Sequence, residues 1–187
     1  GSIEANSKSD LLTTASCIDN LNRHNSQASQ THIFKNILGR DNIYKLHHGE
    51  LTGDDTDGHI DTLARFANDN LILSVDCENE SDEHYAALKL MQQEINNLPF
   101  ENITLPMPEA RFDKDGLRLP ATYANFLITN HSVLVPTYQC KQDAAALSII
   151  QDCFKYKEII GVDCNALIYQ HGSLHCSTMQ VPAPGTK

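Results

Sequence analysis

One layout of segments recurs along this chain at intervals of about 60 residues, and a fixed period constrains the fold before any local pattern does. Each copy opens with two apolar stretches separated by a short polar turn, a pattern typical of a β-hairpin. These hairpins are expected at residues 3–14, 60–75 and 123–135. The chain is therefore predicted to consist of structurally equivalent units.

A helix and a third strand are expected after each hairpin. The helices are indicated by apolar side chains with helical spacing, which are Ile33, Ile37 and Leu38, then Tyr85, Leu88, Met91 and Ile95, then Leu147, Ile150 and Phe154. Short apolar runs then predict strands at residues 43–46, 103–105 and 159–162. The predicted fold class is α/β, built from strand-strand-helix-strand repeats.

The repeat also predicts the organisation of the chain. Units are expected at residues 1–57, 58–120 and 121–172, with a further unit starting at 173–187, all within a single domain. The formal net charge of −10 disfavours nucleic acid and anionic membranes as partners. No apolar stretch approaches the length that crosses a membrane.

Two short segments supply groups that can perform chemistry. Gly58-His59-Ile60-Asp61 offers a base and a carboxylate, and Leu174-His175-Cys176 offers a thiol. Both lie at the predicted opening strand of a unit, and equivalent positions in a closed ring of repeats converge on its axis. Side chains alternate along a strand, so His59 and Asp61 are expected to share a face, whereas His175 should point away from Cys176 and have a structural role.

Four motifs resemble one family of guanidine-modifying enzymes. The segments Thr56-Asp57-Gly58-His59-Ile60-Asp61 and Ala64-Arg65-Phe66 resemble the His/Asp motif of bacterial agmatine deiminases and Porphyromonas-type peptidylarginine deiminases. Gly172-Ser173-Leu174-His175-Cys176, followed by Thr178, Gln180 and Pro182, resembles their nucleophile segment. Asn20-Leu21-Asn22-Arg23 and Tyr123-Ala124-Asn125-Phe126 are also similar to the family pattern. The resemblance spans essentially the whole chain.

This resemblance implies a pseudo-fivefold α/β propeller, or pentein, of which only about three units are present here. Gly1-Ser2-Ile3-Glu4 resembles the end of the family's Glu-Gly-Gly-Ser-Ile segment, although Gly1-Ser2 could equally be a remnant of cloning. The resemblance therefore implies that upstream carboxylates complete the guanidinium site. An open arc of units exposes apolar surface, so a homodimer or completion by a missing N-terminal portion is expected.

The resemblance also implies a reaction and roles for site residues. Cys176 would attack the guanidinium carbon, and His59 would act first as general acid and then as general base. Asp61 would hold the guanidinium through paired hydrogen bonds, and Asp57 is assigned to substrate binding beside it. The substrate would be a small cationic guanidinium compound, and neither a metal nor an organic cofactor is required.

Three functions remain open from the sequence. The leading one is agmatine deimination to N-carbamoylputrescine and ammonia, within putrescine synthesis. The alternatives are a peptidylarginine deiminase, which shares the same groups, and a non-catalytic fragment that lacks the upstream carboxylates. The 187-residue chain alone is expected to have little activity.

Two other readings of the sequence are weaker. The acidic run at residues 54–58 suggests a calcium loop, but its register fails because Gly53 and Ala64 would occupy the first and twelfth positions. This run is interpreted instead as the mouth of the site or the cap of a turn. The six cysteines contain no CxxC pair, which favours reduced thiols in a cytoplasmic enzyme, with the five besides Cys176 serving in packing.

Overall fold

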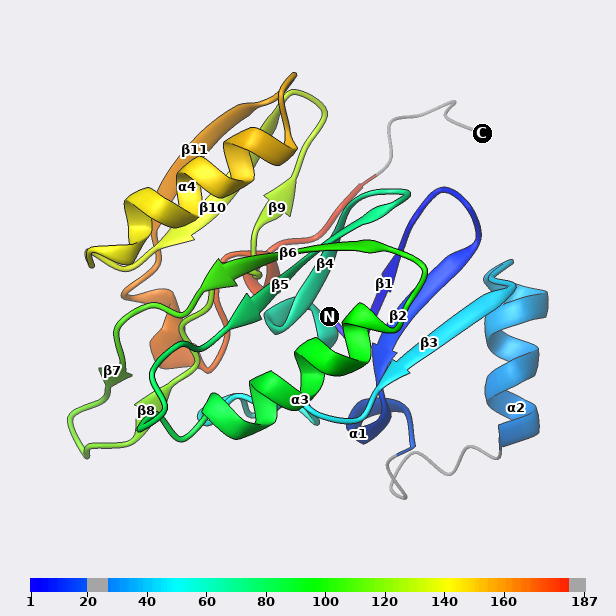
Figure 1. Cartoon of the computed structure of the whole chain (residues 1–187), viewed down its shortest axis with the longest axis horizontal. Helices are drawn as coiled ribbons and strands as arrows, with labels where there is room; N and C mark the ends of the chain where they lie inside the picture. Colours follow the sequence, from blue (N-terminus) through cyan, green and yellow to red (C-terminus); the bar gives the residue numbers. More distant parts are fainter. Residues whose placement is uncertain (20–26, 182–187) are drawn as a thin grey trace.

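The computed structural model describes residues 1–19 and 27–181 and contains three similar three-stranded sheets within them (Figure 1). The first sheet holds β1 (Ile3–Ala5), β2 (Asp10–Thr14) and β3 (Asn42–Leu46). The second holds β4 (Ala64–Asn68), β5 (Leu71–Asp76) and β6 (Glu101–Pro106), and the third holds β9 (Leu127–Ile128), β10 (Ser132–Thr137) and β11 (Glu158–Asp163). The three predicted hairpins and third strands are thereby confirmed.

Each sheet has the same topology. Its first two strands form an antiparallel hairpin, and its third strand pairs in parallel with the middle one. A parallel pair needs a crossover connection. The crossovers contain α2 (Gln27–Thr31), which runs into the π-helix η2 (His32–Ile37), then α3 (Tyr85–Asn96), and then α4 (Gln142–Cys153). The strand-strand-helix-strand prediction is therefore correct for all three units.

The remaining elements are short. A small hairpin of β7 (Arg111–Phe112) and β8 (Arg118–Leu119) lies between the second and third units. Helix α1 (Ala15–Ile18) follows β2, and 3-10 helices are formed by η3 (Ile60–Thr62), η4 (Leu167–Gln170) and η5 (His175–Ser177). No helix among the described residues is both long and apolar enough to cross a membrane.

The predicted strand positions of the two chemical segments are wrong. Asp61 lies in η3 and Cys176 lies in η5, and the strand that follows His59 begins only at residue 64. The Thr62 hydroxyl donates to the carbonyl of His59 at 2.9 Å, and Gly58 has a φ of +77°. Local side-chain hydrogen bonds and left-handed backbone favour a turn over an extended strand.

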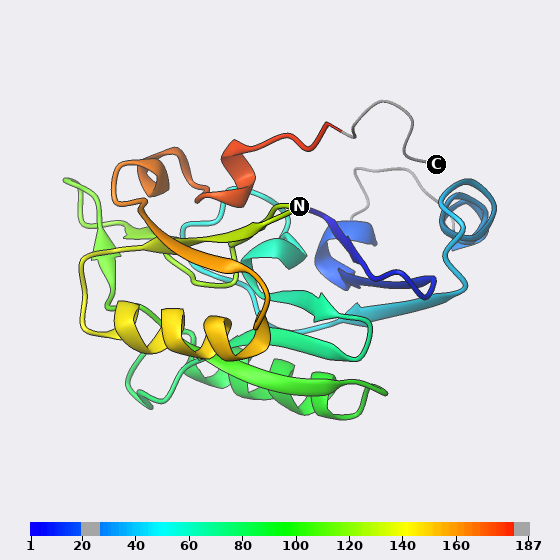
Figure 2. The same ribbon diagram turned by 90° about the horizontal axis from the view of Figure 1, so that it is seen from above.

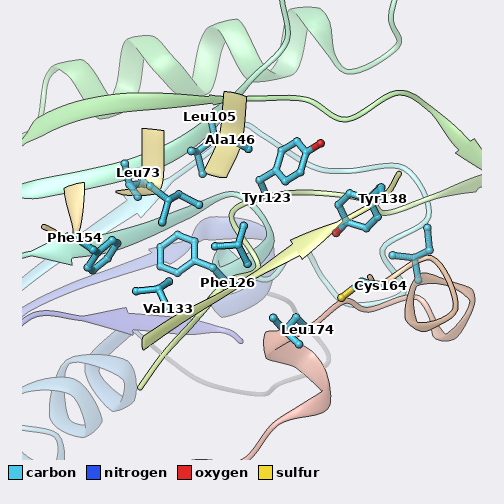
Figure 3. Packing of buried hydrophobic residues seen from close by; sticks show 14 of the residues in the cluster. Leu73, Leu105, Tyr123, Phe126, Val133, Tyr138, Ala146, Phe154, Cys164 and Leu174 are labelled. Atoms are coloured by element: carbon cyan, nitrogen blue, oxygen red, sulfur yellow. The ribbon is translucent and has the colours of Figure 1, made fainter. Parts of the chain in front are cut away.

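Two apolar clusters join neighbouring units. One lies under α3, where Leu88, Met91 and Ile95 pack with residues of the first two sheets such as Leu12 and Ile72. The other contains Leu73, Phe126, Val133 and Phe154 and ends at Leu174, two residues before Cys176 (Figure 3). Burying apolar surface between units therefore also fixes where the Cys176 turn lies.

Helices α3 and α4 and the chemical segments lie on different sides of the sheets. Figure 2 shows α3 and α4 along one side, whereas the N-terminus and the turns that contain η3 and η5 lie on the other. Residues from the second unit and from the last part of the chain are thus brought to one region. This agrees with the convergence expected from equivalent positions of a repeat.

Arg65 joins all three units at one buried point. Its side chain donates from Nε to Glu4 Oε2 at 2.7 Å and from Nη1 to the carbonyl of Phe126 at 2.7 Å. Glu4 also accepts from the backbone N–H of Phe66, and the Arg65 guanidinium stacks 5.2 Å from the centroid of the Phe126 ring. Arg65 is only 5% exposed. The relative placement of the units therefore depends on a buried charge that is paired with Glu4 and with the carbonyl of Phe126.

Replacing Arg65 should be much more destabilising than replacing a surface partner. Arg65→Ala leaves the Glu4 carboxylate buried without its cation, which costs about 3–5 kcal/mol of unfolding free energy. The control is Lys89→Ala, which removes a more exposed ion pair with Asp76 and should cost about 1 kcal/mol or less. Urea unfolding measures both, and equal losses would contradict the role given to Arg65.

A buried histidine holds the loop that leads to His59. His84 accepts from the backbone N–H of Thr52 through Nε2 at 2.8 Å, and its Nδ1 lies 3.0 Å from Asp82. Burial lowers the pKa of His84, and the positive charge of Arg118 lowers it further against the opposing effect of Asp82. The neutral ring is therefore the form that fits, with Nδ1–H facing the carboxylate.

The free energy of unfolding should fall as the pH drops below the ordinary histidine value of 6.5. The folded state keeps His84 neutral while the unfolded chain binds a proton, so acid favours unfolding. In His84→Gln this fall in the free energy of unfolding should be absent between about pH 7 and pH 5 in urea titrations. The control His131→Gln replaces an exposed histidine and should retain it. A His84→Gln profile with the wild-type slope would refute this account.

Candidate active site

Asp61 is the centre of the site. It is 1% exposed, and its Oδ2 lies 2.7 Å from His175 Nδ1 and 3.8 Å from Cys176 Sγ. Its backbone N–H donates to the carbonyl of Gly1 at 3.4 Å. One carboxylate from η3 therefore meets two side chains from η5. The structure thus brings together two of the predicted site residues, Asp61 and Cys176.

His59 lies near the same carboxylate, beside Gly1. A Cβ placed on Gly1 would lie 2.5 Å from His59 Nδ1 and 2.6 Å from Asp61 Oδ1. Because both distances end at one point, the two side chains converge around Gly1. The prediction that His59 and Asp61 share one face of a strand was wrong, because neither residue lies in a strand. Both side chains nevertheless lie beside Gly1.

The backbone before His59 is shaped by its neighbours. Gly58 has positive φ, and a Cβ there would lie 2.8 Å from the Ser16 hydroxyl, so this position suits glycine. The carbonyl of Gly58 accepts from the Thr14 hydroxyl at 2.6 Å. The N–H of His59 donates to Thr56 Oγ1 at 3.1 Å. Contacts with the first unit therefore hold the segment that carries His59.

The Asp61 carboxylate is ionised and ready to accept a further donor. Burial alone would raise its pKa, but the hydrogen bond from His175 and the positive charge of Arg65 act in the opposite direction, and the pKa is lowered. Its Oδ1 is buried and has no hydrogen-bond partner among the residues that the structure describes. An unpaired buried carboxylate oxygen is costly, so this atom marks a place for an N–H donor.

Cys176 reaches solvent, but its sulfur is not in a thiolate-stabilising field. Surrounding protein atoms displace enough water to raise the pKa of the thiol, and the negative charge of Asp61 raises it further. In the described structure, Sγ is in contact with a carboxylate, that of Asp61.

His175 does not point away from the site, as the strand pattern predicted. It lies in a 3-10 helix, where neighbouring side chains do not alternate between two faces. Its Nδ1 contacts the same Asp61 oxygen that faces Cys176. His175 is thus a site residue that sequence reasoning assigned to a structural role.

Asn125 is a second residue whose role the sequence analysis missed. It is 0% exposed, and its Nδ2 lies 3.2 Å from Cys176 Sγ. Its Oδ1 accepts from the backbone N–H groups of His175 at 2.9 Å and Cys176 at 3.3 Å. The motif that contains Asn125 was noted, but the residue itself was given no role. The signal that could have identified it is a polar amide placed between apolar neighbours.

Asp57 directly precedes Gly58 in the segment that leads to His59. It is exposed and lines a cavity of about 320 Å³ beside Gly58, together with Ser16, Glu50, Leu51, Asp54 and Thr56. Asp54 Oδ1 accepts from both the N–H and the hydroxyl of Thr56, which confirms that the acidic run caps a turn. In the described ranges no group of three or more histidines, cysteines or carboxylates is placed to hold a metal ion.

The other predicted features have mixed outcomes. Cys17, Cys77 and Cys164 are buried as packing residues, whereas Cys140 and Cys153 are partly exposed, and no disulfide joins any of the six cysteines. The motif at residues 20–23 and Pro182 lie outside the described residues. The predicted opening strand of a fourth unit is wrong over residues 173–181, which form η5 and irregular backbone instead.

Comparisons with known proteins find relatives that match nearly the whole chain. The sequence matches the family described as Porphyromonas-type peptidyl-arginine deiminase over residues 1–182. The agmatine deiminase of Pseudomonas aeruginosa (strain LESB58) is 29% identical, and the match covers 98% of this chain and 56% of that protein. A solved cysteine-to-serine variant of C. jejuni agmatine deiminase with substrate bound is 39% identical, with a TM-score of 0.91, over 95% of this chain and 54% of that one.

More distant structures show the fold alone. Amidinotransferases from Microseira wollei and Streptomyces griseus are 18% and 16% identical, each with a TM-score of 0.55. They cover 95% of this chain and 45% and 44% of their own. The mixed α/β fold is thus shared with these enzymes. The chain spans about half the length of the relatives it matches.

Neutralising Asp61 should make the Cys176 thiol easier to ionise. Asp61→Asn removes the carboxylate that raises the thiol pKa, so the pH midpoint of Cys176 alkylation should fall. Iodoacetamide labelling with peptide mass spectrometry measures this at Cys176 separately from the other cysteines. Asp152→Asn, whose carboxylate acts on Cys153, is the matched control and should leave Cys176 unchanged. An unchanged or higher midpoint in Asp61→Asn would contradict the electrostatic description.

Proposed function

The chain belongs to the Porphyromonas-type peptidyl-arginine deiminase family, and on that premise we propose that it carries the nucleophile of a site that hydrolyses a guanidinium group. The observation that carries this proposal is the buried, ionised Asp61, with one oxygen unpaired and the other 3.8 Å from Cys176 Sγ. A carboxylate so placed can bind a planar cation, and the thiol beside it can attack the central carbon of that cation. The products are a ureido group and ammonia.

Asp61 binds and orients the substrate in this proposal. A guanidinium presents parallel N–H groups that pair with a carboxylate through charge-assisted hydrogen bonds. The unpaired Oδ1 supplies one acceptor, and Oδ2 lies between His175 and Cys176. A cation held against this carboxylate has its central carbon close to the sulfur. The two reacting atoms are therefore already in position before the bond forms.

Substrate binding also prepares the nucleophile. In the free site, burial and the Asp61 charge keep the thiol protonated. A bound guanidinium neutralises that negative charge and adds a positive one beside Sγ, so the thiol loses its proton more easily when substrate is present. The reactive thiolate is then formed mainly in the complex.

Two steps complete the reaction. The Cys176 sulfur bonds to the guanidinium carbon, and a C–N bond breaks as His59 gives a proton to the departing ammonia, leaving a covalent thiouronium. His59 then takes a proton from water, whose oxygen bonds to the same carbon. The C–S bond breaks, the thiolate is restored and the ureido product leaves. These steps need no redox partner, because the reaction is a hydrolysis in which no atom changes its oxidation state.

Agmatine is the substrate that the charges favour. Glu50, Asp54 and Asp57 line the cavity next to Gly58, and the chain has a formal net charge of −10. Agmatine carries an amine besides its guanidinium, and the acidic cavity suits that second positive charge. The product would be N-carbamoylputrescine. A peptidylarginine deiminase is the second candidate, since the same groups serve both, and its substrate lacks the amine tail.

The fold and assembly proposals follow from the length of the relatives. Three repeat units and the η5 segment account for about half of each matched protein. We infer a pseudo-fivefold propeller in which further units supply additional guanidinium-binding carboxylates, or a homodimer that covers the open faces. A cytoplasmic location is likewise proposed, and six cysteines that form no disulfide support it.

Removing the nucleophile or the base should abolish turnover. In a longer protein that contains this chain, Cys176→Ala loses the attacking atom and His59→Ala loses proton transfer, so ureido product should fall at least about a hundredfold in each. Cys153→Ala is the control and should retain wild-type rates, because Cys153 lies in α4. A colorimetric ureido assay measures all three. Retained turnover in Cys176→Ala, with contaminating wild type excluded, would sink the covalent mechanism.

The same assay separates the candidate functions. Agmatine, free arginine and a blocked arginyl peptide are compared on this chain and on any longer protein that contains it. Turnover of agmatine alone by the longer protein is the expected result, with little from the 187-residue chain. Peptide turnover would favour the second candidate, and no turnover by either form would support the non-catalytic fragment.

A further inference from the structure

We propose that Asn125 is a further catalytic residue, whose carboxamide donates a hydrogen bond to the Cys176 sulfur and stabilises its thiolate. The same amide also holds the Cys176 turn in place. As a statement about catalysis this inference rests on the proposed function, whereas its effect on the thiol does not.

The two ends of the Asn125 amide have different partners. Oδ1 accepts from the backbone N–H groups of His175 at 2.9 Å and Cys176 at 3.3 Å. Nδ2 donates to Cys176 Sγ at 3.2 Å and to the backbone carbonyl of Asp61 at 3.2 Å. Two backbone N–H groups require an acceptor, so they fix which end is oxygen. The NH₂ group must therefore face the sulfur.

Burial makes this position selective for an amide. Asn125 is 0% exposed, as are its neighbours Ala124 and Phe126. An unpaired polar group in such surroundings is strongly disfavoured, so every hydrogen bond of the amide has to be made within the protein. All four of its bonds go to the η3 and η5 segments. The hydrogen bonds of the Asn125 side chain thus hold the two site segments together, and they do not serve a sheet or a helix cap.

The bond to sulfur opposes the groups that disfavour the thiolate. Burial and the Asp61 carboxylate raise the pKa of Cys176, while the donor from Asn125 lowers it. A hydrogen bond to an ionised acceptor is stronger than one to the neutral form, so the amide favours the thiolate over the thiol. Thiolate is both the attacking group and the group released when the thiouronium is hydrolysed, so the donor assists both steps.

The amide also couples the substrate clamp to the nucleophile. It joins the Asp61 backbone to the Cys176 backbone and sulfur through one rigid planar group. The distance between the guanidinium-binding carboxylate and Sγ therefore depends on Asn125. Loss of this link should reduce kcat more than it changes KM, since small displacements of reacting atoms affect the chemical step most.

The test is the pH midpoint of Cys176 alkylation in Asn125→Ala, measured on this chain by iodoacetamide labelling and peptide mass spectrometry. We expect the midpoint to rise by about one pH unit, which is about tenfold less thiolate at a fixed pH below it. The control is Asn102→Ala, which removes an amide bonded to Ser74, Gln92 and Asn96 in the second unit. It should leave the Cys176 midpoint unchanged.

A second variant keeps the test decisive if Asn125→Ala fails to fold. Asn125→Asp retains the shape and the acceptor for both N–H groups, but it replaces the donor to Sγ with an acceptor, so the midpoint should rise there too. An unchanged midpoint in whichever variant folds would overturn the proposal. Alkylation needs no turnover. A raised midpoint, together with no deiminase activity in a longer protein that contains this chain, would refute the proposed function and leave the effect of Asn125 on the thiol standing.

Discussion

The placement of the three units depends on the buried contacts of Arg65 with Glu4 and the carbonyl of Phe126. A buried guanidinium is tolerated only when its donors are paired, and these partners come from the first and third units. Its charge also helps to keep Asp61 ionised in the adjacent 3-10 helix. A single paired cation thus links the architecture of the repeat to the electrostatics of the site.

The repeat made the sheets and crossover helices predictable, because apolar spacing such as Leu88, Met91 and Ile95 is imposed by packing on a sheet. The turns that carry Asp61 and Cys176 were not predictable in this way. They depend on single local hydrogen bonds, such as that from Thr62 to the His59 carbonyl, and on a left-handed glycine. Alternation assigned these residues to strands and therefore misplaced His175.

The site residues were predicted unevenly for a related reason. Cys176 and Asp61 belong to motifs that resemble a known family, and they do meet in the structure. The role of Asn125 depends on partners about 50 residues later in the chain, which no local pattern reveals. In the proposed reaction, the ionised Asp61 holds the substrate beside a thiol that its own surroundings keep protonated, and the bound cation then promotes ionisation of that thiol.

The central claim is that the Cys176 sulfur bonds to the guanidinium carbon. Acid quenching during agmatine turnover by the longest protein that contains this chain, followed by peptide mass spectrometry, tests it most directly. The account predicts a Cys176 peptide that carries the mass of agmatine less ammonia, with the other cysteines unmodified. Steady turnover with the adduct on another residue, or with Cys176 already blocked by alkylation, would contradict it.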